Sequence, residues 1–209
     1  MKLSEFELFI FDFDGTLSMP SFLVRLTRFF KRRYKIDFII EHEDLFSKEG
    51  KVVVERRLEW REKLFSKIYD LYAFFFKPKI KPGTIEVLRE LKRMKKKVAL
   101  FSDGKEDRIR KELAMLRLEE YFDLILAADS IKIFKPNPTP LLLILRNMKV
   151  PKKKSVYIGD MAVDIMTARF AGISSCAVAD GLGGKRDLEK AKPDFLFDNL
   201  KKLREGLKG

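Results

Sequence analysis

Two aspartates two positions apart, Asp12 and Asp14, are the residues of this sequence best placed to do chemistry. They lie in the segment Asp12-Phe13-Asp14-Gly15-Thr16-Leu17, at the end of a short run rich in Phe and Ile. An apolar run that ends in carboxylates and a glycine is typical of a buried parallel strand, and α/β proteins bind ligands at the carboxyl ends of such strands. Two carboxylates there repel each other unless a cation lies between them. We therefore favour a cation-dependent site over the alternative, a pair of turn-forming aspartates.

A second segment offers groups that can bind a phosphate. Ser102 ends another apolar run, and Asp103 and Gly104 lead from it into a predicted helix, whose first amide groups can bind an anion. The structural alternative for Ser102 is capping of the strand end. The glycine-rich loop 181–184 is expected to be a simple turn, because it lacks the Gly-Lys-Ser/Thr ending of a nucleotide-binding loop.

Two later segments add charge. Lys135 is followed by the sequence Pro-Asn-Pro, which restricts the backbone around it, so a role in neutralising an anion is favoured over that of a surface lysine. Asp160 and Asp164 follow an apolar run that is predicted to be a strand. Asp160 is a candidate metal ligand, whereas Asp164 can either serve the site or cap the helix that follows.

The composition limits the metal. Cys176 is the only cysteine and His42 the only histidine, so the chain has neither an internal disulfide nor the thiol and imidazole ligands of a zinc site. A bound metal must therefore use oxygen ligands.

Strands and helices are predicted to alternate along most of the chain, which favours an α/β fold with a parallel sheet. The predicted strands are residues 6–13, 97–102, 123–127, 155–158, 174–179 and 195–197. The predicted helices are residues 84–96, 105–117, 139–148, 163–171 and 199–207.

Residues 18–79 differ from the rest. Apolar residues recur there at spacings near three and four, which predicts two long amphipathic helices. We expect three parts: residues 1–17 as the first part of an α/β core, residues 18–79 as an inserted helical cap, and residues 80–209 as the second part of the core.

Four segments in order resemble the motifs of the haloacid dehalogenase (HAD) superfamily. They are the Asp12 segment, Ser102, Lys135-Pro136-Asn137-Pro138, and the run from Val156 to Asp164 that contains Asp160. The position of the insertion, between the first two motifs, resembles the helical C1 cap of subfamily I and phosphoglycolate phosphatase-like enzymes. The resemblance implies a Rossmann-like parallel sheet with a small all-helical cap that closes over the site and excludes water.

The resemblance also implies a role for each candidate residue. Asp12 is expected to be the nucleophile that forms an aspartyl-phosphate, Asp14 the acid and base, and Lys135 the residue that balances charge. The expected phosphate-binding residues are Ser102, Asp103, Gly104 and Lys135. The expected metal-binding residues are Asp12, Asp14 through its backbone carbonyl, Asp160 and Asp164, with Asp164 orienting either a water or Lys135.

The expected function is that of a Mg²⁺-dependent phosphatase, a phosphoric monoester hydrolase acting on small phosphorylated metabolites. An acid at position 14 favours phosphate ester hydrolysis over haloacid chemistry. One alternative is a phosphotransferase or mutase that uses the same aspartyl-phosphate. The other alternative is a basic nucleic-acid-binding protein or polynucleotide-end phosphatase, motivated by the net charge of +13.

Composition suggests where the protein works. Abundant Lys and Glu with no Gln and three Asn resemble heat-adapted proteins, so the basic excess is interpreted mainly as a solvated surface. Acids flank the first apolar run, which excludes a secretory signal there, and the apolar runs are too short to span a membrane. We expect a cytoplasmic monomer or small homo-oligomer with no membrane partner.

Overall fold

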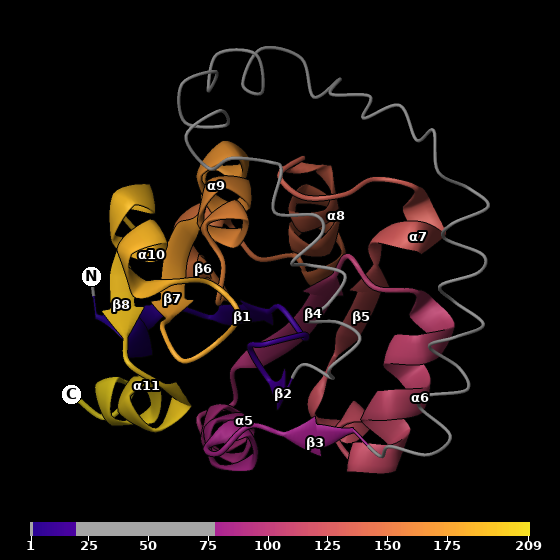
Figure 1. Cartoon of the computed structure of the whole chain (residues 1–209), viewed down its shortest axis with the longest axis horizontal. Helices are drawn as coiled ribbons and strands as arrows, with labels where there is room; N and C mark the ends of the chain where they lie inside the picture. Colours follow the sequence, from indigo (N-terminus) through magenta and orange to yellow (C-terminus); the bar gives the residue numbers. More distant parts are fainter. Residues whose placement is uncertain (1, 20–77) are drawn as a thin grey trace.

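The predicted strands form a single six-stranded parallel sheet in the computed structural model, which describes residues 2–19 and 78–209. The sheet order is β5-β4-β1-β6-β7-β8, and every neighbouring pair is parallel. Figure 1 shows these strands running side by side through the molecule. The strands are β1 (Leu8–Phe11), β4 (Lys97–Ser102), β5 (Leu124–Ala127), β6 (Ser155–Gly159), β7 (Ser174–Val178) and β8 (Phe195–Phe197). The α/β fold with a parallel sheet is therefore confirmed.

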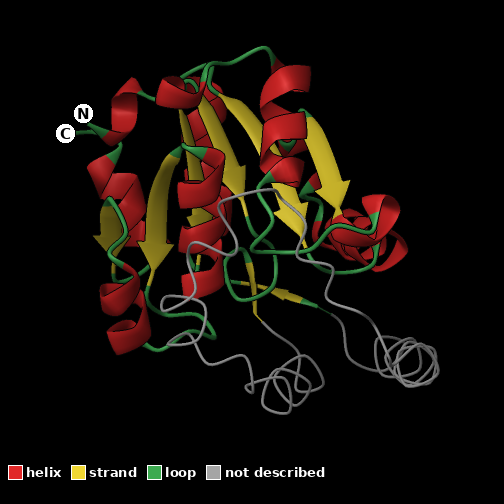
Figure 2. Ribbon diagram, turned by 90° about the horizontal axis from the view of Figure 1, so that it is seen from above, coloured by secondary structure: helices red, strands yellow, loops and turns green. Residues whose placement is uncertain are grey.

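Helices cover both faces of this sheet (Figure 2). They are α5 (Thr84–Arg93), α6 (Glu106–Leu116), α7 (Ala128–Ile131), α8 (Thr139–Met148), α9 (Ala162–Ala171), α10 (Lys185–Ala191) and α11 (Leu200–Gly206). Single turns of 3₁₀ helix lie at η1 (Leu3–Glu5), η2 (Glu119–Tyr121) and η3 (Lys152–Lys154).

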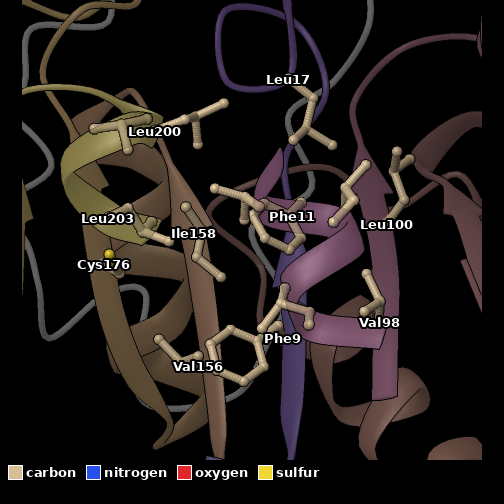
Figure 3. Packing of buried hydrophobic residues seen from close by; sticks show 14 of the residues in the cluster. Phe9, Phe11, Leu17, Val98, Leu100, Val156, Ile158, Cys176, Leu200 and Leu203 are labelled. Atoms are coloured by element: carbon tan, nitrogen blue, oxygen red, sulfur yellow. The ribbon is translucent and has the colours of Figure 1, made fainter. Parts of the chain in front are cut away.

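The sheet separates two cores because side chains alternate along each strand. In β1, Phe9 and Phe11 pack with α5, α6 and α11, whereas Leu8 and Ile10 pack with α8 and α9. Figure 3 shows Phe9 and Phe11 beside apolar residues of the neighbouring strands and Leu200 and Leu203 of α11. All four β1 side chains are fully buried, as expected for a central parallel strand, and this rigid centre carries Asp12 and Asp14.

Several predicted boundaries were wrong. β1 is shorter than the predicted strand 6–13, because the chain turns at both ends of Leu8–Phe11. The helix expected at residues 84–96 ends at Arg93, and Lys95 takes a left-handed backbone conformation with φ of 55° that stops it. The helix α10 was not predicted, because its seven residues are too few to give a clear apolar period.

The two ends of the expected helical insertion are strands. β2 (Ser18–Met19) and β3 (Lys79–Ile80) pair antiparallel, with Ser18 opposite Ile80 and Met19 opposite Lys79. The chain therefore leaves the core and returns to it at one place. Residues 20–77, where the two long helices were predicted, lie outside the described residues.

Candidate active site

The carboxyl ends of β1 and β6 bring Asp12 and Asp160 together. The two strands pair in register, with Phe11 opposite Ile158, and the Asp12 amide donates to the Ile158 carbonyl at 2.8 Å. From β1 the chain continues to β4 and β5 on one side of the sheet, and from β6 it continues to β7 and β8 on the other side. Ligands of open α/β sheets bind where the strand order changes direction in this way, here between β1 and β6. Both carboxylates are buried.

Thr16 bridges these two acids. Its hydroxyl Oγ1 lies 2.9 Å from Asp160 Oδ1 and 3.4 Å from Asp12 Oδ2, and the residue is fully buried. The turn that carries Thr16 is closed by hydrogen bonds from its amide and from those of Leu17 and Ser18 to the Phe13 carbonyl. Thr16 was part of the recognised segment but was given no role, because only the tertiary structure places its hydroxyl against Asp160.

Lys135 reaches the same acids from the loop between α7 and α8. Its Nζ lies 2.5 Å from Asp12 Oδ1 and 2.7 Å from Asp164 Oδ1, and the side chain is only 4% exposed. The ammonium also lies 5.3 Å and 5.4 Å from the ring centroids of Phe101 and Tyr157. Burial alone would lower the pKa of Lys135, but the Asp12 and Asp164 carboxylates outweigh it and raise the pKa well above its usual value. Lys135 is therefore a permanent positive charge beside Asp12.

Asp164 makes both of the contacts that the sequence left as alternatives. Its Oδ2 accepts a hydrogen bond from the Met161 amide at 2.9 Å, which caps the start of α9. Its Oδ1 accepts from Lys135 and, at 3.3 Å, from the Tyr157 hydroxyl. One carboxylate thus fixes the helix and orients the lysine.

The glycine-rich loop after β7, expected to be a simple turn, lies against Asp160. The Leu182 amide donates to Asp160 Oδ2 at 2.6 Å. A Cβ atom at Gly181 would lie 2.3 Å from the same oxygen, and one at Gly15, where φ is +91°, would lie 2.4 Å from it. Both positions therefore require glycine, for space and, at Gly15, also for backbone conformation. The position of this loop after a parallel strand was the signal that could have indicated its role.

The segment 102–104 lies at the same edge, since β4 is the other neighbour of β1. Ser102 is buried, and its Oγ accepts a hydrogen bond from the Gly104 amide at 3.1 Å. Asp103 accepts from the Lys135 amide at 3.1 Å, so it holds the loop that carries Lys135. At the start of α6, the Glu106 amide donates to Asp129 at 2.9 Å, so that helix amide already has an acceptor.

Asp14 is paired with an arginine that the sequence analysis did not single out. Arg108 of α6 donates from Nη1 to Asp14 Oδ1 at 2.9 Å and from Nη2 to Oδ2 at 2.5 Å. Asp14 is 5% exposed. The only sequence signal was a basic residue in the first turns of the helix after Ser102, which is too common on helix surfaces to indicate a site.

Lys81 was also missed. It is 4% exposed, donates from Nζ to the Gly15 carbonyl at 2.9 Å, and forms an ion pair with Asp180. It therefore joins the turn that follows Asp14 to the loop that contacts Asp160. In the sequence it stands three positions before the helix predicted at residues 84–96, with nothing near it to indicate its partners.

The acidic residues fit a divalent cation. Carboxylate oxygens of Asp12, Asp160 and Asp164 lie within 4.8 Å of one another, and all three residues are buried. Three carboxylates with the single positive charge of Lys135 leave a net charge of −2 in a space screened from water. Hard oxygen ligands and this charge suit Mg²⁺ or a similar ion.

This combination of a parallel sheet and an acidic site at its carboxyl edge defines a class of protein. Residues 9–178 match the family model of the haloacid dehalogenase-like hydrolases, so the chain belongs to that family. The expected family and the expected hydrolase class of enzyme are thereby confirmed.

The chain is similar to an individual pyrophosphatase and to solved structures of a predicted phosphatase and a proposed mutase. The chain is 28% identical over 205 residues to the pyrophosphatase PpaX of Bacillus cereus (strain B4264), with 93% of each chain covered. Among solved structures, it resembles a predicted phosphoglycolate phosphatase from Haemophilus somnus at a TM-score of 0.73 and 19% identity, covering 97% and 98% of the two chains. It also resembles a proposed β-phosphoglucomutase from Thermotoga maritima at a TM-score of 0.68 and 26% identity, covering 97% of each chain.

None of the helices in the described part of the chain has the length and apolarity needed to cross a membrane.

Proposed function

We propose that the protein is a Mg²⁺-dependent phosphatase that hydrolyses small phosphorylated metabolites through an aspartyl-phosphate. The single observation that carries this proposal is the position of Asp12, a buried carboxylate that lies 2.5 Å from the Lys135 ammonium and beside two further acids. A carboxylate can attack an anionic phosphate only where cations offset the repulsion. The family membership and the relation to a pyrophosphatase support the same chemistry.

In the first step, an Asp12 oxygen forms a bond to phosphorus as the bond from phosphorus to the leaving oxygen breaks. Asp14, which Arg108 binds as a carboxylate, must first take up a proton and then gives it to that leaving oxygen. In the second step, water attacks phosphorus, Asp14 takes a proton from it, and the bond between Asp12 and phosphorus breaks to release inorganic phosphate. Lys135 holds the Asp12 carboxylate in place and balances the phosphoryl charge, while the Ser102 hydroxyl, whose oxygen accepts from the Gly104 amide, offers its proton to a phosphoryl oxygen.

The proposed ligands of Mg²⁺ are the side chains of Asp12, Asp160 and Asp164, the last directly or through a water, together with the Asp14 carbonyl. Bound there, the ion would neutralise charge on the phosphoryl group. Thr16 and the Leu182 amide hold the Asp160 oxygens in position, and Lys135 and the Met161 amide hold those of Asp164.

We further propose that residues 18–79 form the cap that covers this site. The support is the ribbon of β2 and β3, which brings both ends of the segment together. Ser18 also forms a bridge with Asp14, so the segment leaves the core beside a proposed catalytic residue. Water exclusion by the cap would decide between hydrolysis and transfer to another substrate, and the resemblance to a proposed mutase makes transfer the second candidate.

The test is phosphate release from a panel of phosphomonoesters and pyrophosphate with Mg²⁺. We expect the wild-type protein to release phosphate and Asp12→Asn to lose at least about a thousandfold in kcat, because an amide is a far weaker nucleophile. Asp198→Asn, on an exposed side chain that pairs with Lys185, is the matched control and should retain full activity.

Two results would contradict the proposal. Full activity of Asp12→Asn would exclude Asp12 as the nucleophile. Absence of phosphate release from every substrate would exclude phosphatase activity. Product analysis separates the candidates, since transfer of phosphate to a sugar hydroxyl without net release would favour the phosphotransferase.

A further inference from the structure

Arg108 lies beside Asp14, the residue that is proposed to protonate the leaving oxygen. The residue that protonates a leaving oxygen must come within hydrogen-bond distance of it. Both oxygens of Asp14, which has that role in the proposed function, are bound by the two terminal nitrogens of Arg108, at 2.9 Å and 2.5 Å. Any leaving group that meets Asp14 therefore also meets this guanidinium.

The guanidinium also adjoins the proposed phosphate loop. A Cβ atom on Gly104 would lie 2.2 Å from Arg108 Nη2, so the charged group passes directly over the backbone of that loop. Arg108 also contacts Glu112, one helical turn further along α6, whose Oε1 accepts from Nη1 at 3.1 Å. The Arg108 side chain is 14% exposed, so it is largely buried beside Asp14.

The pairing has a chemical consequence. Arginine binds carboxylates and phosphates alike through two parallel hydrogen bonds, so an anionic group of a substrate can take the place of Asp14. While both Asp14 oxygens face Arg108, neither is free to turn toward a leaving oxygen. A neutral leaving group offers Arg108 no replacement for Asp14, whereas an anionic one does.

We propose that Arg108 determines substrate specificity by binding an oxyanion carried by the leaving group, a phosphate or a carboxylate, in exchange for Asp14. This inference rests on the proposed phosphatase function and adds the class of substrate, a phosphoryl compound whose leaving group bears a second negative charge. For pyrophosphate, the phosphoryl group passes to Asp12, the bridging P–O bond breaks, and Arg108 holds the departing phosphate.

The experiment compares substrates that differ in this charge. The probes are pyrophosphate, phosphoglycolate and the neutral amide analogue of phosphoglycolate, each assayed with Mg²⁺ for kcat and KM separately. We expect the wild-type protein to prefer phosphoglycolate over its amide by at least about tenfold in kcat/KM, since a charge-assisted pair is lost with the amide.

Arg108→Gln should lower kcat/KM for both anionic substrates by about tenfold to a hundredfold, mainly through KM, and change the value for the amide by less than about threefold. Arg108→Lys keeps the charge but cannot form two parallel hydrogen bonds. Its kcat/KM for the anionic substrates should lie between the values for the wild type and Arg108→Gln. This variant replaces Arg108→Gln in the test if the glutamine variant does not fold. Arg110→Gln, on the exposed side of the same helix, is the control and should match the wild type.

Four outcomes would overturn the inference. Equal losses on charged and neutral substrates would make Arg108 only a support for Asp14. No loss on any substrate, or a wild-type protein that hydrolyses phosphoglycolate and its amide equally well, would remove the role of the leaving-group charge while leaving the phosphatase in place. Turnover of other phosphomonoesters but of neither pyrophosphate nor phosphoglycolate would also overturn the inference, whereas absence of turnover with the whole substrate panel would overturn the proposed function itself.

Discussion

Lys135 shows how one residue can fix the electrostatics of a buried site. It sits between Asp12 and Asp164 with almost no exposure, and these carboxylates are the reason that it stays charged. Removing its charge would leave the acids at the end of β1 and β6 to repel one another. The lysine and a divalent cation are therefore complementary means of holding the same carboxylates.

Cys176 lies in the core beneath this site and gives a test of pH dependence. Burial, followed by the negative charge of Asp194, raises the pKa of its thiol far above the usual value. The unfolded thiol ionises near pH 8.5, so the stabilising contribution is complete below about that pH and is lost as the pH rises above it, by up to about 1.4 kcal/mol per pH unit.

We expect the free energy of unfolding to fall between about pH 8 and pH 9.5, below the range in which tyrosines and lysines titrate in the unfolded chain. Cys176→Ala should have a shallower slope over this range, whatever its effect on the absolute stability. Denaturant unfolding at several pH values measures both slopes. Identical slopes would show that Cys176 does not contribute.

At the scale of elements, the site is a meeting of loops at one sheet edge. The loops after β1, β4, β6 and β7 each supply a contact, and the loop before α8 supplies Lys135. Lys81 connects two of these loops, since its ammonium joins the Gly15 carbonyl to Asp180. It also stands directly between β3 and α5, where the chain re-enters the core.

Lys81→Met should therefore destabilise the protein, because it leaves the Gly15 carbonyl and Asp180 without their buried partner. Asp180 is 35% exposed, which reduces the effect to about 1–3 kcal/mol, less than the cost of breaking a fully buried pair. Denaturant unfolding measures the change. Lys92→Met removes a surface pair with Asp123, exposed at both ends, and should cost less than about 1 kcal/mol. Equal costs for the two variants would contradict the linking role of Lys81.

At the scale of the whole molecule, a cation bound at the sheet edge should stabilise the folded state. Mg²⁺ that binds only the folded protein raises its stability by about 2.7 kcal/mol at a concentration a hundredfold above the dissociation constant. Thermal unfolding with Mg²⁺ and with EDTA measures this without any assay of activity.

We expect Asp160→Asn to lose most of the rise in melting temperature, and Glu205→Gln, an exposed acid on α11, to keep it. A wild-type protein that Mg²⁺ does not stabilise would argue against the acidic residues as a magnesium site.

The net charge of +13 also belongs to the whole molecule. The nucleic-acid alternative predicts binding to DNA or RNA that weakens steeply between two salt concentrations. Absence of binding to DNA and RNA at low salt would exclude the nucleic-acid-binding alternative.

The sequence alone was enough to indicate the six sheet strands, apart from their exact ends, and the α/β class, and to predict that the acids at positions 12, 14, 160 and 164 meet at one sheet edge. Short apolar runs and Asp residues that follow them are local patterns, and parallel strands necessarily gather their carboxyl ends at one edge. It was not enough for the partners of those acids. Arg108 lies 94 positions from Asp14, and Lys81 lies 66 from Gly15. Hydrogen bonds between side chains far apart in the chain leave no local period, so only the packing of α6 and α5 against the sheet decides which basic residue meets which acid.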